Sequence, residues 1–229
     1  MLDTFILKID RNIEKDDYYR LLGYVSEEKK IRISEFYRFE DSQHSLLGDV
    51  LVRYAICNRL GIKNDRLVFG SNGYGKPILL DPHGIHFNIS HSGSWVVCAI
   101  EDKKVGIDVE LIKPINMKIA ERFFSKDEYI SLRNVPEKMR LKYFYMLWTL
   151  KESYIKAEGN GLNIPLSSFM VNIESYNLYN SEGSEIKKYC FYQYFLENDT
   201  VCVICTLARK PEESMRFDID LFLEETHLI

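Results

Sequence analysis

The chain has 229 residues, of which 46% are hydrophobic and 28% are charged, a balance that is typical of a folded globular protein and excludes a disordered one. Its formal net charge of -4 provides no overall basic field that could hold nucleic acid or an anionic membrane surface. The first residues lack the basic and apolar regions of a signal peptide, and no apolar run approaches the roughly 20 residues of a membrane span, so we expect a cytoplasmic protein.

The N-terminal part begins with an expected strand over residues 4–9 and continues to a helix that Ser26 caps, with acidic residues in the first turn. Lys29 and Arg32 lie three residues apart on one face of this helix, and Lys30 flanks them. Such a face is either solvated or, if an anionic ligand docks there, a clamp for phosphate.

Residues 42–60 form the clearest expected helix, because apolar residues recur along it at helical spacing and Gly61 follows as a capping residue. His44 and Ser45 fall in its first turn, where free backbone N–H groups favour an anion. This position suits a negatively charged ligand only in combination with other anion-binding groups.

A turn-rich loop over residues 70–77 carries Lys76 and leads into a hairpin. The strands of the hairpin are expected over residues 85–89 and 95–100, with Ser90 and His91 in the turn between them. A hydroxyl and an imidazole on one turn are either ordinary polar surface or a site for phosphate.

Residues 105–110, Val-Gly-Ile-Asp-Val-Glu, alternate as a strand does, with one apolar face and one face that carries Gly106, Asp108 and Glu110. Two carboxylates roughly 6.5 Å apart along the backbone repel each other unless a cation lies between them, and we expect Gly106 to leave open space beside them. Hard oxygen ligands with no Cys or His nearby favour Mg²⁺. The alternative is an exposed strand face at the edge of a sheet.

Residues 141–158 are expected to form a long helix that ends at Gly159. On this helix Glu152 falls inside the apolar sector beside Trp148, and Lys156 lies one turn further along. A carboxylate in an apolar face needs a cation, a metal or a hydrogen-bond donor. The alternative is an ordinary Glu–Lys pair at i,i+4, worth about 0.2–0.5 kcal/mol.

Before this helix, Ser125 and Glu128 fit a capping box, which we favour over a catalytic role for Glu128. After it, the pattern is rich in strands, and the acidic tail from residue 212 is expected to be peripheral. Cys202 and Cys205 are spaced as a CxxC pair. They fall in an expected strand over residues 200–207, where positions three apart point to opposite faces, so we predict core thiols and no zinc site.

The two halves of the chain repeat one order of elements: a long apolar helix, a Gly-containing loop that ends in Pro, and strands that close in a hairpin. This order predicts an α+β fold of two similar, pseudo-symmetric subdomains, residues 1–104 and 105–229, with the carboxylate-bearing strand near the seam. Three carboxylates and Lys156 beside anion-binding groups favour a phosphorylated substrate, a metal-neutralised transition state and a cation at the leaving group.

Several motifs together resemble the 4'-phosphopantetheinyl transferases, in particular the Sfp-type class that activates peptide and polyketide synthetases. They are Leu-Leu-Gly-Asp-Val-Leu-Val-Arg at 46–53, Tyr-Gly-Lys-Pro at 74–77, Phe-Asn-Ile-Ser-His-Ser at 87–92, Val-Gly-Ile-Asp at 105–108, Arg-Phe-Phe-Ser at 122–125 and Trp-Thr-Leu-Lys-Glu-Ser at 148–153. The resemblance implies a monomer with coenzyme A bound at the seam. It implies that the phosphopantetheine arm moves, with Mg²⁺, to a serine of an apo acyl or peptidyl carrier protein in nonribosomal peptide, polyketide or fatty acid synthesis, releasing 3',5'-ADP.

Carried over by position, the resemblance implies Mg²⁺ ligands at Asp108, Glu110 and Glu152. Glu152 is also the implied base for the attacking serine, and Lys156 protonates or neutralises the leaving phosphate. The implied nucleotide-binding residues are Lys29, Arg32, Ser45, Lys76, Ser90 and His91. The segment after Phe124 is implied to receive the carrier, and we expect recognition to rest on the apolar residues Phe123, Phe124 and Tyr129.

Two positions depart from the family pattern. Arg32 replaces an expected Lys and preserves the charge, whereas His44 replaces an expected Arg, which weakens or removes a contact to the 3'-phosphate. Two other functions remain open from the residues: a Mg²⁺-dependent phosphohydrolase that acts on coenzyme A or a related nucleotide with water as the nucleophile, and an inactive module that binds coenzyme A.

Overall fold

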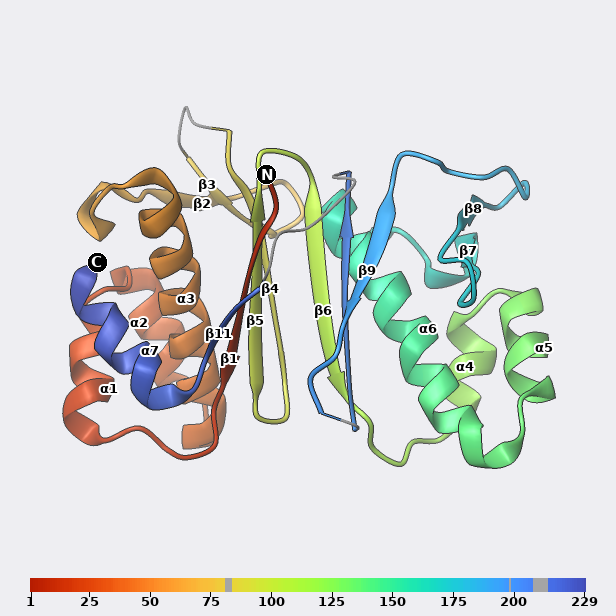
Figure 1. Cartoon of the computed structure of the whole chain (residues 1–229), viewed down its shortest axis with the longest axis horizontal. Coiled ribbons are helices and arrows are strands. Elements are labelled where there is room, and N and C mark those ends of the chain that lie inside the picture. The colour runs from red at the N-terminus through yellow and green to blue at the C-terminus, as the bar shows by residue number, and fades with distance from the viewer. Residues whose placement is uncertain (81–83, 198, 208–213) are drawn as a thin grey trace.

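The computed structural model describes residues 1–80, 84–197, 199–207 and 214–229. Two β-sheets lie side by side at the centre of the molecule, and helices cover the outer side of each sheet (Figure 1). The strand order is β11-β1-β5-β4 in the N-terminal sheet and β6-β10-β9 in the C-terminal sheet. None of the described helices is both long enough and apolar enough to cross a membrane.

The N-terminal half runs in chain order through β1 (Asp3–Lys8), α1 (Lys15–Leu22), α2 (Glu27–Ser34), α3 (Phe39–Leu60), η1 (Asn64–Arg66), β2 (Phe69–Ser71), β3 (Pro77–Leu79), β4 (His86–Ser92) and β5 (Trp95–Glu101). The C-terminal half follows with β6 (Val105–Leu111), α4 (Lys118–Phe123), α5 (Lys126–Asn134), α6 (Glu137–Glu158), η2 (Gly161–Asn163), η3 (Leu166–Ser168), β7 (Phe169–Val171), β8 (Leu178–Asn180), β9 (Cys190–Tyr194) and β10 (Thr200–Thr206). A last segment adds β11 (Met215–Phe217), α7 (Ile219–Glu225) and η4 (Thr226–Leu228).

The two halves share one plan, which confirms the predicted α+β fold with two similar parts. Each contains a 22-residue helix, α3 or α6, and each helix ends at a left-handed glycine, Gly61 with φ 64° and Gly159 with φ 79°. In each half the first strand pairs antiparallel with the last strand of the hairpin, β1 with β5 and β6 with β10. The subdomain boundary between residues 104 and 105 stays a prediction.

Three apolar cores hold these layers together. One lies in the N-terminal half around α3, one lies in the C-terminal half around α6, and a third lies between the sheets, with Ile6, Val97, Ile107 and Ile204 among its members. The strand period places Cys202 in the core between the sheets and Cys205 in the core around α6, as predicted. The two sheets therefore face each other across a dry layer.

The C-terminal tail corrects a prediction, because the segment from Met215 onward is not peripheral. β11 pairs in parallel with β1, and Phe217 and Phe222 are buried in the N-terminal core against the ring of Tyr54. Residues 212 and 213 lie outside the described residues. Asp218, Asp220 and Glu224 are exposed and alternate with the few buried apolar residues, so the acidic composition of the tail gave no sign of its packing.

At the seam, β4 of the N-terminal half runs beside β6 of the C-terminal half, and side chains join the two strands. Asn88 Oδ1 accepts a hydrogen bond from the Ile107 amide at 2.8 Å, and Ser92 Oγ accepts one from the Leu111 amide at 3.0 Å. The two strands belong to different sheets, and no backbone ladder joins them within the described residues. The seam is thus built from polar side chains of β4 reaching the backbone of β6.

Candidate active site

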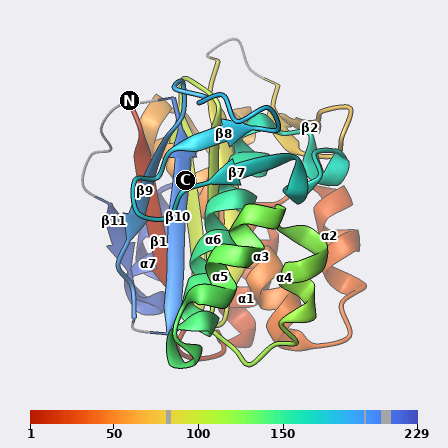
Figure 2. The same ribbon diagram turned by 90° about the vertical axis from the view of Figure 1, so that its right-hand side faces the viewer.

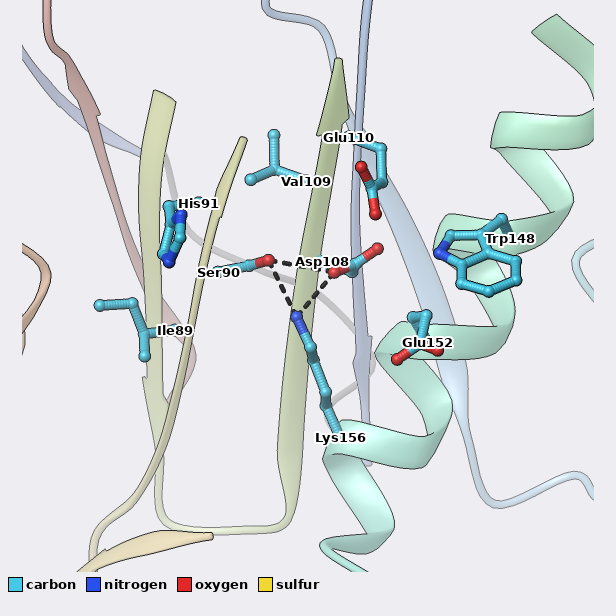
Figure 3. Close-up of a pocket in the computed structure, with 9 residues that line it drawn as sticks. All are labelled: Ile89, Ser90, His91, Asp108, Val109, Glu110, Trp148, Glu152 and Lys156. Carbon is cyan, nitrogen blue, oxygen red and sulfur yellow. Dashed lines mark hydrogen bonds and ion pairs between the residues drawn. The ribbon is translucent and has the colours of Figure 1, made fainter. Parts of the chain in front are cut away.

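A cavity of about 440 Å³ opens at this seam, between β4, β6 and α6. Figure 3 shows the side chains that line it: Ile89, Ser90, His91, Asp108, Val109, Glu110, Trp148, Glu152 and Lys156. The structure therefore brings together all three predicted metal ligands, the predicted leaving-group lysine and two of the predicted nucleotide-binding residues, from three segments that span residues 89 to 156.

Gly106 sets the distance between the strand and the helix that carry the carboxylates. We expected open space beside it, and this was wrong. A Cβ at Gly106 would lie 2.1 Å from Ser153 O and 2.3 Å from Ala157 N, so the backbone of α6 fills that space. The alternation of β6 directs Asp108 and Glu110 to the same side as Gly106, as predicted, and this close approach is what places Glu152 opposite them.

Lys156 makes its ion pair across the cavity rather than along its own helix. Its Nζ lies 2.6 Å from Asp108 Oδ1 and donates to Ser90 Oγ at 2.8 Å, while Ser90 Oγ donates to the same carboxylate oxygen at 3.0 Å. The ordinary i,i+4 pair with Glu152 is therefore not the interaction that the structure shows for Lys156. The second oxygen of Asp108, Oδ2, is buried and has no hydrogen-bond partner among the described residues.

The two other carboxylates of the cavity are held in conditions that disfavour their charge. Burial and the nearby charge of Asp108 raise the pKa of Glu110 to about 7. The charge of Lys156 and a hydrogen bond of 3.4 Å from the Ser92 hydroxyl oppose this rise. Burial and Asp108 also raise the pKa of Glu152. Three carboxylates thus line one cavity with a single lysine, Lys156, among the lining residues. A further cation would reduce the repulsion between the carboxylates.

The carboxylate side chains of the cavity have the ligand chemistry that a divalent metal ion needs, but they do not surround a common point in this structure. Within the described ranges, no group of three or more His, Cys, Asp or Glu side chains stands close enough to hold a metal ion. The donors are hard carboxylate oxygens, one of them buried and unpartnered, and the ammonium of Lys156 stands against the same Asp108 carboxylate.

Ser90 and His91 lie inside β4 rather than in a turn, which corrects the expected hairpin. Ser92 pairs with Trp95, so the turn is only Gly93 and Ser94, and the strand continues three residues further than its apolar pattern predicted. Strand alternation then sends Ser90 toward Asp108 and His91 to the other side, where its ring stacks on that of His44 with centroids 5.7 Å apart. Partial burial and the charges of His44 and Lys156 lower the pKa of His91.

His44 and Ser45 do not lie in the first turn of α3, as we expected. The helix begins at Phe39, where Arg38 is extended and the acidic Glu40 and Asp41 occupy the first turn, so the two residues fall in the second turn. There the Nδ1 of His44 hydrogen-bonds the Glu40 carbonyl at 2.7 Å. The N–H groups that lack a partner within the helix belong to the first turn, which begins at Phe39. His44 reaches the cavity region through its contact with His91, whereas Ser45 does not line the cavity.

Comparison with known proteins shows the family of this chain. A family model described as the 4'-phosphopantetheinyl transferase superfamily matches residues 104–205, and a model described as 4'-phosphopantetheinyl transferase, N-terminal, matches residues 12–103. The 4'-phosphopantetheinyl transferase ffp of Bacillus subtilis is 40% identical over 89% of this chain and 91% of its own length. The chain belongs to the 4'-phosphopantetheinyl transferase superfamily.

Two further relatives are of the same kind. The 4'-phosphopantetheinyl transferase Sfp of Bacillus subtilis (strain 168) is 44% identical over 72% of this chain and 74% of its own length, and 4'-phosphopantetheinyl transferase gsp of Aneurinibacillus migulanus is 42% identical over 75% and 72%. The resemblance to the Sfp-type class is thereby confirmed. The chain is a transferase that moves the phosphopantetheine arm of coenzyme A to a carrier protein, and the hydrolase reading is not supported.

The other residues expected to bind the nucleotide in this transferase lie outside the cavity lining. Lys29 is half-buried on α2 with its Nζ 3.9 Å from an Asp49 carboxylate oxygen, and its charge is close enough to lower the pKa of His91. Arg32 is exposed and pairs with Glu28 on the same helix at 2.7 Å. Lys76 donates to two backbone carbonyls at the end of α6 and the start of β6. Their role in binding stays a prediction.

Glu128 is a structural residue of the transferase, as favoured from the sequence. It completes the capping box with Ser125 and also accepts two hydrogen bonds from the Nζ of Lys151, at 2.6 and 2.8 Å. Lys151 is fully buried, and the sequence analysis did not single it out. A lysine in the middle of an apolar helix indicates a partner carboxylate, because a buried charge needs one. This pair ties α5 to the helix that carries Glu152 and Lys156.

Phe124 is a core residue rather than a carrier-contacting one, which corrects our expectation. It is 4% exposed, and its ring packs on Phe144 at 5.2 Å and on Trp148 at 6.5 Å. Phe123 and Tyr129 are half-buried, and the guanidinium of Arg122 lies 5.2 Å over the ring of Phe123. A Phe124 substitution would therefore disturb the core behind Trp148 before it altered the surface.

Proposed function

We propose that Asp108, Glu110 and Glu152 hold a divalent cation, Mg²⁺ by their ligand chemistry, against the pyrophosphate of coenzyme A. The observation that supports this most is the meeting of three carboxylates in one cavity while Asp108 Oδ2 is buried without a partner. The raised pKa of Glu110 and of Glu152 supports it too, because each is the response of a carboxylate that lacks a cation. When bound, such an ion neutralises charge on the transferring phosphoryl group.

We further propose that Glu152 accepts the proton of the attacking carrier serine. The serine Oγ forms a bond to the phosphorus that bears the pantetheine arm, and the bond from that phosphorus to the bridging oxygen of the pyrophosphate breaks, so that 3',5'-ADP leaves. The carboxylate of Glu152 extends from α6 into the cavity beside Trp148, where the serine hydroxyl can reach it directly or through a water molecule. Lys156, already directed into the cavity, stabilises or protonates the leaving phosphate.

The nucleotide is proposed to lie along β4 and the start of α3, where hydroxyl, imidazole and ammonium groups are found. Ser90 and His91 line the cavity from β4, the ring of His44 stacks on that of His91, and the charge of Lys29 is close enough to affect His91. Arg32 and Ser45 complete the predicted set without a contact in the structure that tests them. An imidazole at position 44 is a weaker partner for a phosphate than a guanidinium, so we propose a weakened contact to the 3'-phosphate.

The acceptor is proposed to be an acyl or peptidyl carrier protein that docks over the half-buried ring of Phe123 and the segment after Phe124. The ring of Phe123 meets that of Trp148, a cavity residue, edge-on with centroids 6.0 Å apart. Activity in nonribosomal peptide, polyketide or fatty acid synthesis, and action as a monomer, belong to the same proposal.

Intact-mass spectrometry of an apo peptidyl carrier protein incubated with the enzyme, coenzyme A and Mg²⁺ tests the proposal. We expect the carrier to gain one phosphopantetheine, the gain to stop with EDTA and to return with excess Mg²⁺. Glu152→Gln should lower the initial rate by about 10²–10⁴-fold. Glu137→Gln, a matched change at an exposed position of the same helix, should leave the rate unchanged.

Two results would contradict the proposal. A rate that EDTA does not change would remove the metal from the reaction. Cleavage of coenzyme A without any labelling of several carriers would show that water, not serine, is the nucleophile.

A further inference from the structure

The C-terminal end of α6 is capped by a loop from the other half of the molecule. The last carbonyls of a helix lack partners within the helix. Here the amide of Gly159 closes back onto Ile155 O at 2.9 Å, whereas Lys156 O accepts a hydrogen bond from Lys76 Nζ at 2.6 Å and Gly159 O accepts one from Asn72 Nδ2 at 2.8 Å. Both donors come from the loop between β2 and β3 in the N-terminal half, at the end of the molecule where α6 finishes (Figure 1).

This loop is a fixed structure, so its two donors move together. The side-chain Oδ1 of Asn72 accepts hydrogen bonds from the backbone N–H groups of Tyr74 and Lys76, both at 2.9 Å. The backbone N–H of Asn72 donates to Lys76 O at 2.9 Å. Lys76 Nζ also donates to Val105 O at 3.2 Å. A single ammonium group therefore links the β2–β3 loop, the first residue of β6 and the last turn of α6.

The capped turn is the one that carries Lys156 into the cavity. On its inner side, the same turn presses on Gly106 of β6, where a Cβ would lie 2.8 Å from the carbonyl carbon of Lys156. On its outer end, Lys76 holds the carbonyl oxygen of that same residue. With its backbone fixed from two sides, Lys156 extends a side chain that reaches Asp108 Oδ1 at 2.6 Å.

We propose that the loop between β2 and β3 positions Lys156 for the reaction, with Asn72 and Lys76 as positioning residues that act through the end of α6. The inference rests on the proposed role of Lys156 at the leaving phosphate. It assigns Lys76 a role different from the expected nucleotide contact, because its three-donor ammonium is already directed at two backbone carbonyls and not into the cavity. The reaction thus depends on a contact between the two halves that lies outside the residues lining the cavity.

Steady-state kinetics with coenzyme A and an apo carrier protein test this role. We expect Lys76→Met and Asn72→Ala each to lower kcat by about tenfold or more, because a small misplacement of a catalytic group is costly, while KM for coenzyme A changes by less than twofold. Lys104→Met is the matched control, since Lys104 reaches the same helix end through a side chain and not through its backbone carbonyls, with its Nζ 2.8 Å from Glu158 Oε2, and should leave kcat unchanged. Circular dichroism at the assay temperature gives the folded fraction for each variant.

A double-mutant cycle with Lys156→Ala shows whether the loop acts through Lys156. If it does, Lys76→Met and Asn72→Ala produce no further loss of kcat once Lys156 is gone. The inference is overturned if the losses multiply with that of Lys156→Ala. It is also overturned if Lys76→Met raises KM for coenzyme A tenfold with kcat unchanged, or if kcat per folded molecule stays at the wild-type value. Failure of the wild-type enzyme to label any carrier would instead refute the proposed function.

Discussion

The first strands of the two halves, β1 and β6, hold equivalent places in the two sheets, yet one serves the core and the other carries the chemistry. The face of each strand that points away from the core between the sheets carries Phe5 and Leu7 on β1 but Gly106, Asp108 and Glu110 on β6. Phe5 packs edge-on against Tyr54 of α3, with ring centroids 6.2 Å apart. The corresponding face of β6 meets a helix that brings Glu152 and Lys156.

The free edges of the two strands differ as well. β11 covers the edge of β1 with a backbone ladder, whereas β4 meets the edge of β6 through the side chains of Asn88, Ser90 and Ser92. A strand joined only through side chains leaves room beside the carboxylates for a cavity. The comparison teaches that one repeated scaffold gains an active site by replacing two apolar residues with acids and by leaving one strand edge without a backbone partner.

The largest contrast that we expect between the two halves comes from the glycines that bring a helix close to a sheet in each of them. Gly106→Ala places a Cβ 2.1 Å from the backbone oxygen of Ser153, which cannot move without shifting α6, so we expect a loss of more than about 3 kcal/mol in unfolding free energy. Gly48→Ala in α3 meets only the flexible end of Ile89 at 2.8 Å and gains up to about 1 kcal/mol in helix propensity. Urea unfolding of both variants tests this. Equal losses would mean that the two halves tolerate the added methyl alike.

A second contrast concerns the buried cation on each long helix. Lys151→Met removes the partner of Glu128, which is 6% exposed, and should destabilise the protein by about 3–5 kcal/mol. Arg53→Met removes the partner of Asp49, whose side chain is 25% exposed and keeps Lys29 within 3.9 Å, so about 1 kcal/mol is expected. Thermal and urea unfolding measure both. A smaller loss for Lys151→Met would show that Glu128 is satisfied by its backbone donors alone.

The smallest expected effect is a pH-dependent one that only the C-terminal half should show. In the metal-free protein, burial and Asp108 raise the pKa of Glu110 from 4.5 to about 7, so between these values the folded state binds more protons than the unfolded state. Stability therefore falls as the pH rises through this window and stays low above it. Glu110→Gln stays neutral, and with solvent screening of its partly exposed side chain we expect it to be about 1 kcal/mol more stable than the wild type near pH 8.

Urea unfolding in EDTA at about pH 5 and about pH 8 checks this prediction. The two proteins should differ at the higher pH and converge at the lower one, and added Mg²⁺ should stabilise the wild type more than the variant. A variant that loses stability with pH as the wild type does would contradict it.

The repeating helix–loop–hairpin order and the face of β6 were predictable because period-two and period-3.6 patterns leave their mark in the sequence. The ion-pair partner of Lys156 was harder to predict. The i,i+4 spacing of Glu152 and Lys156 is visible on a helix wheel, but Lys156 pairs with Asp108 instead, and this pair depends on how closely Gly106 lets α6 approach. The position of Lys76 was unpredictable for a similar reason. Its carbonyl partners belong to elements distant in sequence, and the family motif that contains it says nothing of them.

The parallel pairing of β1 with β11 has a consequence for how the protein is made. At roughly 5–20 residues per second, β1 leaves the ribosome on the order of 10–40 s before β11 is synthesised. Every strand of the C-terminal sheet is complete in that interval, whereas the outer edge of β1 waits for Phe5 to meet Met215. During translation the apolar strand β1 thus exposes an unpaired edge, the kind of edge on which nascent chains associate with one another.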